Sequence, residues 1–379
     1  MTAPALLERV RARLALQPGV PTRAGVAALV REESAGLLGD ADVLAAVRDA
    51  VDELAGAGPL EPLLRLPGVT DVLVNGPDQV WIERGRGLEL TEVRFQDDDA
   101  VRRLAVRLAA SAGRRLDDAA PWVDAGLRDG TRLHAVLPPV SGSGTCLSLR
   151  VLRRCSLSLE DLVGLGALPG EVFDLLRTLV ARRLAFLVTG GTGSGKTTLL
   201  SALLGQADPA DRLVICEDAA ELAPAHPHAV RLLSRPPNVE GVGAITLRDL
   251  VRQALRMRPD RLVVGEVRGA EVTELLAALN TGHDGGCGTL HANRPGEVPA
   301  RLEALGMAAG LERAAVHSQA AAALAVVVHL RRTPAGRRVD ELGVVRSAAG
   351  HVTVEAGWRA NGGPCPAADR LRRLLDSGP

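Results

Sequence analysis

The clearest hydrophobic pattern in the chain is an apolar run that ends in glycines and is followed by a second apolar segment with helical spacing. Residues 184–188 are Leu-Ala-Phe-Leu-Val, residues 190–197 are Gly-Gly-Thr-Gly-Ser-Gly-Lys-Thr, and residues 198–204 are Thr-Leu-Leu-Ser-Ala-Leu-Leu. A short apolar run bounded by glycine favours a buried strand, and the longer segment after it favours a helix. The pattern therefore predicts a strand, a glycine-rich loop and a helix in direct succession.

Beyond this loop, strand-like apolar runs alternate with helix-like segments. Strands are expected at 212–216, 261–265, 288–291, 323–330 and 340–345, and helices at 246–257, 269–279 and 299–305. Such alternation predicts a mainly parallel sheet that binds its ligand at the carboxyl ends of the strands. We expect a turn at Arg337 and Arg338, and a loosely held tail with a short basic helix over residues 361–379.

The part of the chain before the loop shows two other patterns. Apolar stripes among arginines predict helices over residues 1–55, an N-terminal arm that either packs on the protein or binds a partner. Residues 56–155 predict a small α/β domain, with strands at 69–75, 79–83, 88–95, 131–137 and 145–151 and a helix at 97–112. Residues 156–360, which begin with a helical connector, form the second domain.

Composition narrows the class of protein. The chain has 379 residues, 46% of them hydrophobic, and a formal net charge of zero, so we expect two packed domains and no direct binding of nucleic acid. The cysteines are scattered and odd in number, which favours reduced thiols over a zinc site or a disulfide framework: Cys146, Cys155, Cys216, Cys287 and Cys365. No apolar run is long enough to span a bilayer, so we expect a cytoplasmic protein whose membrane contact is peripheral.

The glycine-rich loop matches the phosphate-binding pattern G-x4-G-K-[ST] through Gly190, Gly195, Lys196 and Thr197. Backbone N–H groups of such a loop bind phosphate oxygens, the lysine reaches the β- and γ-phosphates, and the threonine hydroxyl ligates Mg²⁺. Lys196 is the only lysine of the chain. We therefore predict binding of ATP and Mg²⁺, with the remaining contacts from Gly191, Thr192, Gly193, Ser194 and Thr198.

Three later segments carry candidate chemistry. Glu217 and Asp218 follow a strand, where carboxylates can hold Mg²⁺ or orient the attacking water, although they can also be solvated loop acids. Glu266 ends an apolar strand and is a candidate general base, with a purely structural acid as the alternative. His283 and His291 can sense a γ-phosphate; a metal site or buried core histidines are the other readings.

The chain resembles the type II/type IV secretion ATPase superfamily, and most of all its Tad (tight adherence) pilus-assembly branch. The resemblance spans residues 56–345. It is carried by Gly58-Pro-Leu-Glu-Pro62, 69–77, Glu217-Asp-Ala-Ala-Glu-Leu222, 235–241, 246–260, Gly265-Glu-Val-Arg-Gly269, Asn280-Thr-Gly-His-Asp284 and Thr289-Leu-His-Ala-Asn293.

The resemblance implies a RecA-like P-loop ATPase domain joined to a smaller, PAS-like N-terminal α/β domain, assembled as a homo-oligomer, namely a hexamer. It assigns Glu217 to the Asp box, as a catalytic and Mg²⁺-linked acid, Glu266 to Walker B and His291 to the His box. It also implies that Arg132 and Arg150 reach the phosphates, with surface salt bridges as the alternative. The zinc module of some type II members is missing from this sequence.

These features predict a motor that hydrolyses MgATP to drive pilus assembly or protein secretion through a polytopic membrane platform protein. The rival is a conjugation-type or nucleic-acid translocase ATPase. Such a motor usually needs a basic channel and aromatic stacking platforms, and aromatic residues make up only 2% of this chain.

Overall fold

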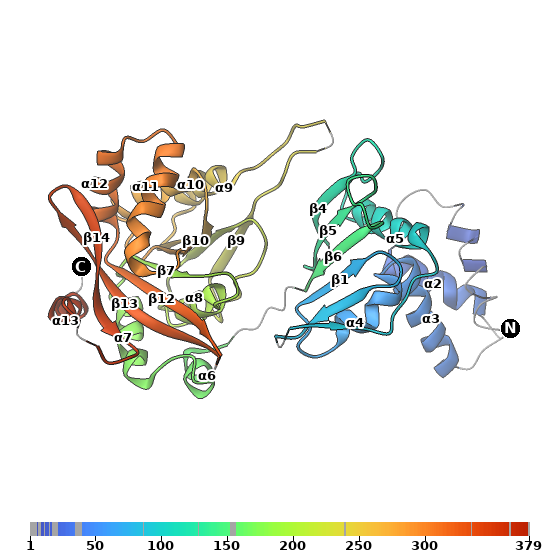
Figure 1. The fold of residues 1–379 in the computed structure, drawn as a ribbon, viewed down its shortest axis with the longest axis horizontal. Coiled ribbons are helices and arrows are strands. Elements are labelled where there is room, and N and C mark those ends of the chain that lie inside the picture. Colours follow the sequence, from blue (N-terminus) through green and yellow to red (C-terminus); the bar gives the residue numbers. More distant parts are fainter. Residues whose placement is uncertain are drawn as a thin grey trace. The chain divides into compact units, whose positions relative to one another are not determined.

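The computed structural model describes residues 6, 9–10, 12–14, 16, 22–34, 40–85, 87–127, 129–151, 157–238, 240–334, 336–363 and 365–377. The chain divides into two compact units, Met1–Arg153 and Arg154–Pro379 (Figure 1). Cys155 and most of the helix predicted at the very start of the chain lie outside the described residues. The domain limits given above stay predictions.

In the first unit two helices pack against each other, α2 (Arg23–Ser34) and α3 (Asp40–Leu54). Their facing side chains form a small apolar cluster of their own, which also includes Leu6 and Val10. Helices were expected here, and the role of these residues as an arm stays a prediction. The short helices η1 (Gly58–Leu60) and α4 (Glu61–Arg65) lead into the sheet.

The rest of the first unit is a six-stranded antiparallel sheet with strand order β3-β2-β1-β6-β5-β4. Its elements are β1 (Asp71–Asn75), β2 (Val80–Glu83), β3 (Leu88–Leu90), α5 (Asp98–Ser111), β4 (Trp122–Gly126), β5 (Arg132–Val136) and β6 (Cys146–Arg150). Alternate strand residues and one face of α5 form a single apolar core. Helix α5 starts where its acidic first turn predicts, because the Asp97 carboxylate accepts the N–H of Ala100 at 2.7 Å.

Two strands of this sheet differ from the prediction. The third strand was expected to reach Phe95, but β3 ends at Leu90, and all of its residues are exposed at the edge of the sheet. Strand β4 was not predicted: it alternates between exposed and buried positions, and Asp124 and Gly126 weaken the sequence signal of a strand. The predicted PAS-like character of this unit stays a prediction.

The second unit contains an eight-stranded sheet with order β14-β13-β12-β7-β11-β10-β8-β9. Its strands are β7 (Phe186–Gly190), β8 (Leu213–Glu217), β9 (Ala229–Leu233), β10 (Arg261–Val267), β11 (Cys287–His291), β12 (Val326–Thr333), β13 (Gly336–Ala348) and β14 (His351–Arg359). The strands from β12 to β9 are parallel, whereas β13 and β14 are added antiparallel. The predicted α/β class and mainly parallel sheet are confirmed.

Helices cover both faces of this sheet (Figure 1). One face packs against α6 (Leu159–Gly164), α7 (Gly170–Ala181), α8 (Lys196–Leu204) and α13 (Ala368–Ser377). The other packs against α9 (Leu247–Ala254), α10 (Glu271–Leu279), α11 (Val298–Ala308) and α12 (Arg313–Ala323), with short turns η2 (Leu255–Met257) and η3 (Pro295–Glu297) beside them. Within β7, Phe186 and Val188 enter the first core and Leu187 enters the second, as the two-residue period of a strand requires.

Two predictions about the C-terminal part are wrong. The predicted tail is not loosely held over its described residues 365–377, because Leu371 and Leu375 of α13 are 3% and 4% exposed within the main core. Arg337 and Arg338 do not form a turn, because they lie in β13; the strands reverse at Pro334, so that Thr333 pairs with Gly336. Gly336 is compatible with a tight reversal at this point, whereas the two adjacent arginines had placed the predicted turn too late in the sequence.

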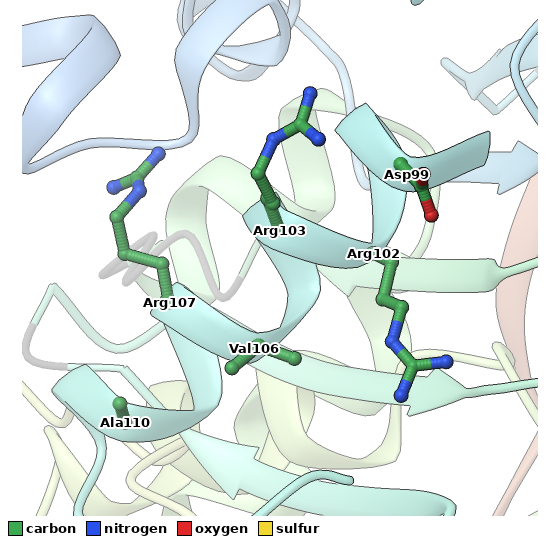
Figure 2. Close-up of a pocket in the computed structure, with 6 residues that line it drawn as sticks. All are labelled: Asp99, Arg102, Arg103, Val106, Arg107 and Ala110. Atoms are coloured by element: carbon green, nitrogen blue, oxygen red, sulfur yellow. The ribbon is translucent and has the colours of Figure 1, made fainter. Parts of the chain in front are cut away.

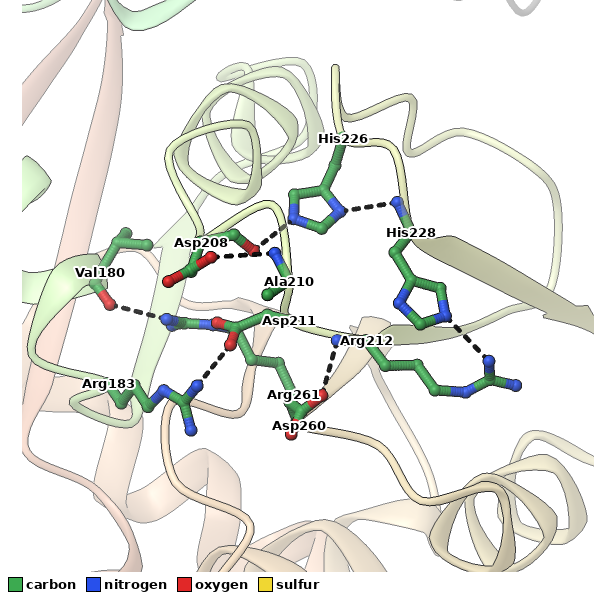
Figure 3. Close-up of polar contacts among 10 residues, drawn as sticks. All are labelled: Val180, Arg183, Asp208, Ala210, Asp211, Arg212, His226, His228, Asp260 and Arg261. Carbon is green, nitrogen blue, oxygen red and sulfur yellow. Dashed lines mark hydrogen bonds and ion pairs between the residues drawn. The ribbon is translucent and has the colours of Figure 1, made fainter.

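A buried ion pair anchors the amino ends of the central strands (Figure 3). Arg261 and Asp211 are each 2% exposed, and Arg261 Nε donates to Asp211 Oδ2 at 2.7 Å. Arg261 also donates to the carbonyl of Val180 at 3.0 Å, and Arg183 contacts the same carboxylate. These bonds satisfy charges that would be costly to bury alone, and they fix the edge of the sheet opposite the glycine-rich loop.

Candidate active site

The glycine-rich loop connects β7 to α8 at the carboxyl edge of the sheet, as predicted. Gly190 has φ +152°, and a Cβ built on it would lie 2.5 Å from Ser194 Oγ and 2.6 Å from the carbonyl oxygen of Leu330, so only glycine fits. Gly195 has φ +96° and precedes α8, whose first turn has no side-chain cap among the described residues. Unbonded N–H groups at a helix N-terminus form a binding site for anions.

The remaining loop residues differ in their exposure. Gly191, Thr192 and Gly193 are exposed, and Thr198 is half-buried in α8. Ser194 Oγ is buried and has no hydrogen-bond partner within the described part of the chain. A hydroxyl that is buried without a partner costs free energy, so Ser194 is suited to a ligand oxygen that would complete its bonding.

Lys196, His291 and Glu266 lie in a contact chain at the mouth of the loop. Lys196 Nζ donates to the carbonyls of Gly190 and Gly191 at 3.1 and 3.0 Å and lies 3.3 Å from His291 Nε2. The same His291 nitrogen lies 2.8 Å from Glu266 Oε1. The structure thus brings three of the predicted catalytic residues together from α8, β11 and β10.

Burial and neighbouring charge perturb two of these groups. Burial lowers the pKa of Lys196, and the nearby carboxylates of Glu266 and Glu221 oppose that shift. Burial and the Lys196 charge lower the pKa of His291. A lysine buried beside carbonyl oxygens and a neutral histidine is prepared for an anionic ligand, which would restore the favourable environment of the ammonium group.

Glu217 lies at the end of β8 and is 3% exposed. Its Oε1 accepts the N–H groups of Leu222 and Glu221 at 2.8 and 3.1 Å, and its Oε2 is buried without a partner among the described residues. Burial raises the pKa of Glu217 to about 7. This oxygen is free to hold a water molecule or a cation, which is compatible with its predicted role; that role stays a prediction.

The position of Glu217 explains why β10 carries Gly265 where many nucleotide-binding strands carry aspartate. A Cβ built on Gly265 would lie 2.7 Å from Glu217 Cγ. The neighbouring strand therefore supplies a carboxylate at the place that a β10 side chain would occupy. An aspartate at Gly265 would force Glu217 out of this position.

Glu221 is a site residue that our sequence reasoning did not single out. Thr197 Oγ1, the hydroxyl predicted to ligate Mg²⁺, donates to Glu221 Oε2 at 3.3 Å. Asp218, by contrast, accepts from Ser234 at 2.6 Å and pairs with Arg268 at 2.6 Å. The signal that could have found Glu221 is its place four residues after Glu217, in a segment that turns back over α8.

The two predicted histidines do not act together. His283 precedes β11 and lies 3.3 Å from the carbonyl of Ala278, whereas His291 ends the same strand at the loop. A metal site shared by the two is excluded, because the length of β11 separates them. Within the described residues, no group of three His, Cys, Asp or Glu side chains is arranged to hold a metal ion.

The predicted arginines belong to the first unit. Arg132 in β5 and Arg150 in β6 are direct cross-strand neighbours. Arg132 pairs with Asp124 at 2.6 Å and Arg150 pairs with Asp71 at 3.1 Å, so each makes a surface ion pair in this structure. Their contact with phosphates stays a prediction.

A shallow hollow of about 330 Å³ also lies in the first unit (Figure 2). Its lining comes only from the exposed face of α5: Asp99, Arg102, Arg103, Val106, Arg107 and Ala110. Arg102 is neutralised by Asp118 at 2.5 Å, and Arg107 donates to the carbonyl of Gly56 at 2.6 Å. We therefore assign the candidate active site to the loop of the second unit.

Comparison with known proteins places the chain in a family. The family model described as type II/IV secretion system protein matches residues 53–374. A putative conjugal transfer protein of Mycobacterium tuberculosis is 59% identical over 348 residues, which cover 90% of this chain and 99% of that protein. The probable conjugal transfer protein TrbB of Sinorhizobium fredii is 33% identical over 76% of this chain and 87% of its own length.

The fold agrees with that result. The crystal structure of the pilus retraction motor PilT with bound ADP matches with a TM-score of 0.53 and 22% identity, covering 74% of this chain and 80% of that one. No helix in the described parts of the chain has both the length and the apolar character needed to cross a bilayer. With a family match over most of its length, the chain belongs to the type II/IV secretion system protein family.

Proposed function

We propose that the protein is an ATPase motor that hydrolyses MgATP. The observation that carries this proposal is the contact chain from Lys196 through His291 to Glu266 at the mouth of a phosphate-binding loop. A cation that reaches the terminal phosphates and a carboxylate that activates water are needed at the same place for phosphoryl transfer to water. Here one imidazole separates them.

The residues of the loop would bind the triphosphate. The N–H groups of the loop and of the first turn of α8 would donate to phosphate oxygens, and Lys196 would exchange its two carbonyl partners for them. Ser194 Oγ would gain the partner it lacks. Thr197 and the acids Glu217 and Glu221 would hold Mg²⁺, which supplies charge neutralisation on the phosphates.

Glu266 would act as the general base on the attacking water. Its half-buried carboxylate is held by His291 at 2.8 Å, a bond that keeps it directed to the loop. In the proposed oligomer, a hexamer, Arg132 and Arg150 would add positive charge at the phosphates. The position of Glu266 beside His291 supports its role, whereas the role of the two arginines rests on the family resemblance.

We further propose that the motor drives pilus assembly of the Tad type, or protein secretion, through a polytopic platform protein in the membrane. It would work at the cytoplasmic face as a peripheral protein. Membership of the type II/IV secretion family supports a role in transport across a membrane. The cargo and the platform would be tested by copurification of the full chain with membranes that contain the neighbouring gene products.

The ATPase proposal is tested with purified full-length protein. We expect Lys196→Ala to lose both nucleotide binding and phosphate release, and Glu266→Gln to bind ATP but to release little phosphate. Glu160→Gln, an exposed acid of α6, is the matched control and should turn over like the wild type. Undiminished phosphate release by either site variant would refute the assignment.

A conjugation-type or nucleic-acid translocase motor is the second candidate, favoured by the names of the relatives from M. tuberculosis and S. fredii. The net charge of zero and the few aromatic residues argue against direct contact with single-stranded DNA. Phosphate release with and without single-stranded DNA separates the two proposals. Strong stimulation by DNA would favour the translocase.

A further inference from the structure

The hairpin of β12 and β13 brings four arginines together beside the glycine-rich loop. In its register Arg331 pairs with Arg338, and Arg332 pairs with Arg337. Directly opposed like charges destabilise an antiparallel pair of strands. Two such pairs in succession require nearby negative charge. The two faces of the hairpin differ in where that charge comes from.

On one face the compensation is internal. Asp340 Oδ1 lies 3.0 Å from Arg331 and 3.2 Å from Arg338, so one carboxylate serves both guanidinium groups. On the other face, no carboxylate among the described residues forms an ion pair with Arg332 or Arg337. The positive charges of Arg332 and Arg337 are therefore not balanced by an ion pair among the described residues.

The uncompensated pair faces the phosphate-binding loop. Strand β12 runs parallel to β7 and places Leu330 beside Gly190, which sets the start of the hairpin next to the start of the loop. A Cβ built on Gly193 would lie 3.9 Å from Arg332 Nη1, and one built on Gly195 would lie 3.5 Å from Arg337 Cδ. Both side chains therefore border the place where the loop would hold phosphates.

We propose that Arg332 and Arg337 bind the polyphosphate of the nucleotide from within the same unit that carries the loop. This inference rests on the proposed function and adds binding residues to it. The phosphate groups would supply the negative charge that no carboxylate of the described residues supplies on this face. Guanidinium groups suit the task, because they are always charged and donate in pairs to phosphate oxygens.

Binding of nucleotide by the full chain tests the proposal. We expect Arg332→Gln and Arg337→Gln each to weaken ATP binding about tenfold, the effect of about 1.4 kcal/mol from one charged hydrogen bond. Arg331→Gln removes the same charge from the opposite face of the hairpin, leaves Asp340 paired with Arg338, and should bind ATP like the wild type. Arg332→Lys should recover part of the loss, because lysine keeps the charge but lacks the planar pair of donors of the guanidinium group.

Thermal unfolding without nucleotide separates binding from a structural role. If the pair is uncompensated, Arg332→Gln should melt at or above the temperature of the wild type, and only the rise that MgATP produces should be smaller. A lower melting temperature without nucleotide, together with unchanged ATP affinity, would overturn the proposal. If the wild type itself fails to bind MgATP, the proposed function fails; if it binds and both glutamine variants bind equally well, only this inference fails.

Discussion

The buried carboxylate of Glu217 makes the stability of the second unit depend on pH. Its side chain is 3% exposed, and burial raises its pKa from 4.5 to about 7, against the opposing effect of two backbone N–H donors and Arg231. The change we consider is Glu217→Gln, which keeps the shape of the protonated acid and the acceptor for Leu222 and Glu221. The glutamine side chain cannot become charged.

The direction of the pH dependence follows from the number of protons that each state binds. Between pH 4.5 and 7 the folded state holds a proton on Glu217 that the unfolded state has lost, so the free energy of unfolding falls as pH rises through this range. A shift of this size at about 1.4 kcal/mol per pKa unit corresponds to about 3 kcal/mol. The wild type should lose that amount relative to Glu217→Gln between pH 4 and pH 8.

Urea unfolding followed by tryptophan fluorescence can isolate the second unit. The chain has 3 tryptophans, and Trp358 in β14 is the one that packs against the core of this unit. With Trp81 and Trp122 of the first unit replaced by phenylalanine, the emission reports the unfolding of the second unit alone. The measurement compares this background with and without Glu217→Gln at each pH.

Two results would contradict a raised pKa of Glu217: the same pH dependence in both proteins, or a wild type that gains stability relative to the variant as pH rises. The first result would mean that Glu217 titrates like a solvated carboxylate. The second would mean that it is held as a charged group, as a bound cation would hold it. A metal-free buffer with chelator is therefore part of the design.

Three other predictions concern Mg²⁺ binding, the buried ion pair and the packing of α13. Glu221→Gln should raise the Mg²⁺ concentration needed for half-maximal phosphate release, since Thr197 loses its acidic neighbour; an unchanged Mg²⁺ dependence would exclude this role. Asp211→Asn should lower the free energy of unfolding by about 3–5 kcal/mol, because it leaves Arg261 buried without its counter-ion; urea titration would contradict this with a loss below 1 kcal/mol. Leu371→Ala should cost about 2–4 kcal/mol if α13 is part of the core; a melting curve that matches the wild type would mean that the helix is dispensable.

Local sequence signals predicted much of the second unit because its strands are buried on both faces. Continuous apolar runs such as 184–188 and 262–264 can be recognised without knowledge of their partners. Helix starts also depend on local sequence, since Ser158 and Thr246 both form capping boxes, with Asp161 and Asp249.

The failures came from features that depend on distant residues. Helix α13 is short and rich in charged residues, and only its packing against the core shows that Leu371 and Leu375 are structural. Two adjacent arginines at 337 and 338 indicated a polar turn. In the structure they pair across the strands with Arg332 and Arg331, and such pairing of like charges is not expected from the sequence. The role of Gly265 likewise needs Glu217 from another strand to explain it.

His291 connects the binding of phosphate to the state of the base. A neutral imidazole nitrogen either donates or accepts, so His291 Nε2 cannot serve Glu266 and Lys196 at once. The shorter contact, 2.8 Å to Glu266, is the hydrogen bond, and Lys196 at 3.3 Å is a neighbouring positive charge that lowers the pKa of His291. Phosphate that engages Lys196 would offset that charge, so we expect the pKa of His291 to rise and its hold on Glu266 to strengthen. Histidine NMR titration with and without MgADP, assigned by His291→Gln, would contradict this if the pKa stayed the same or fell.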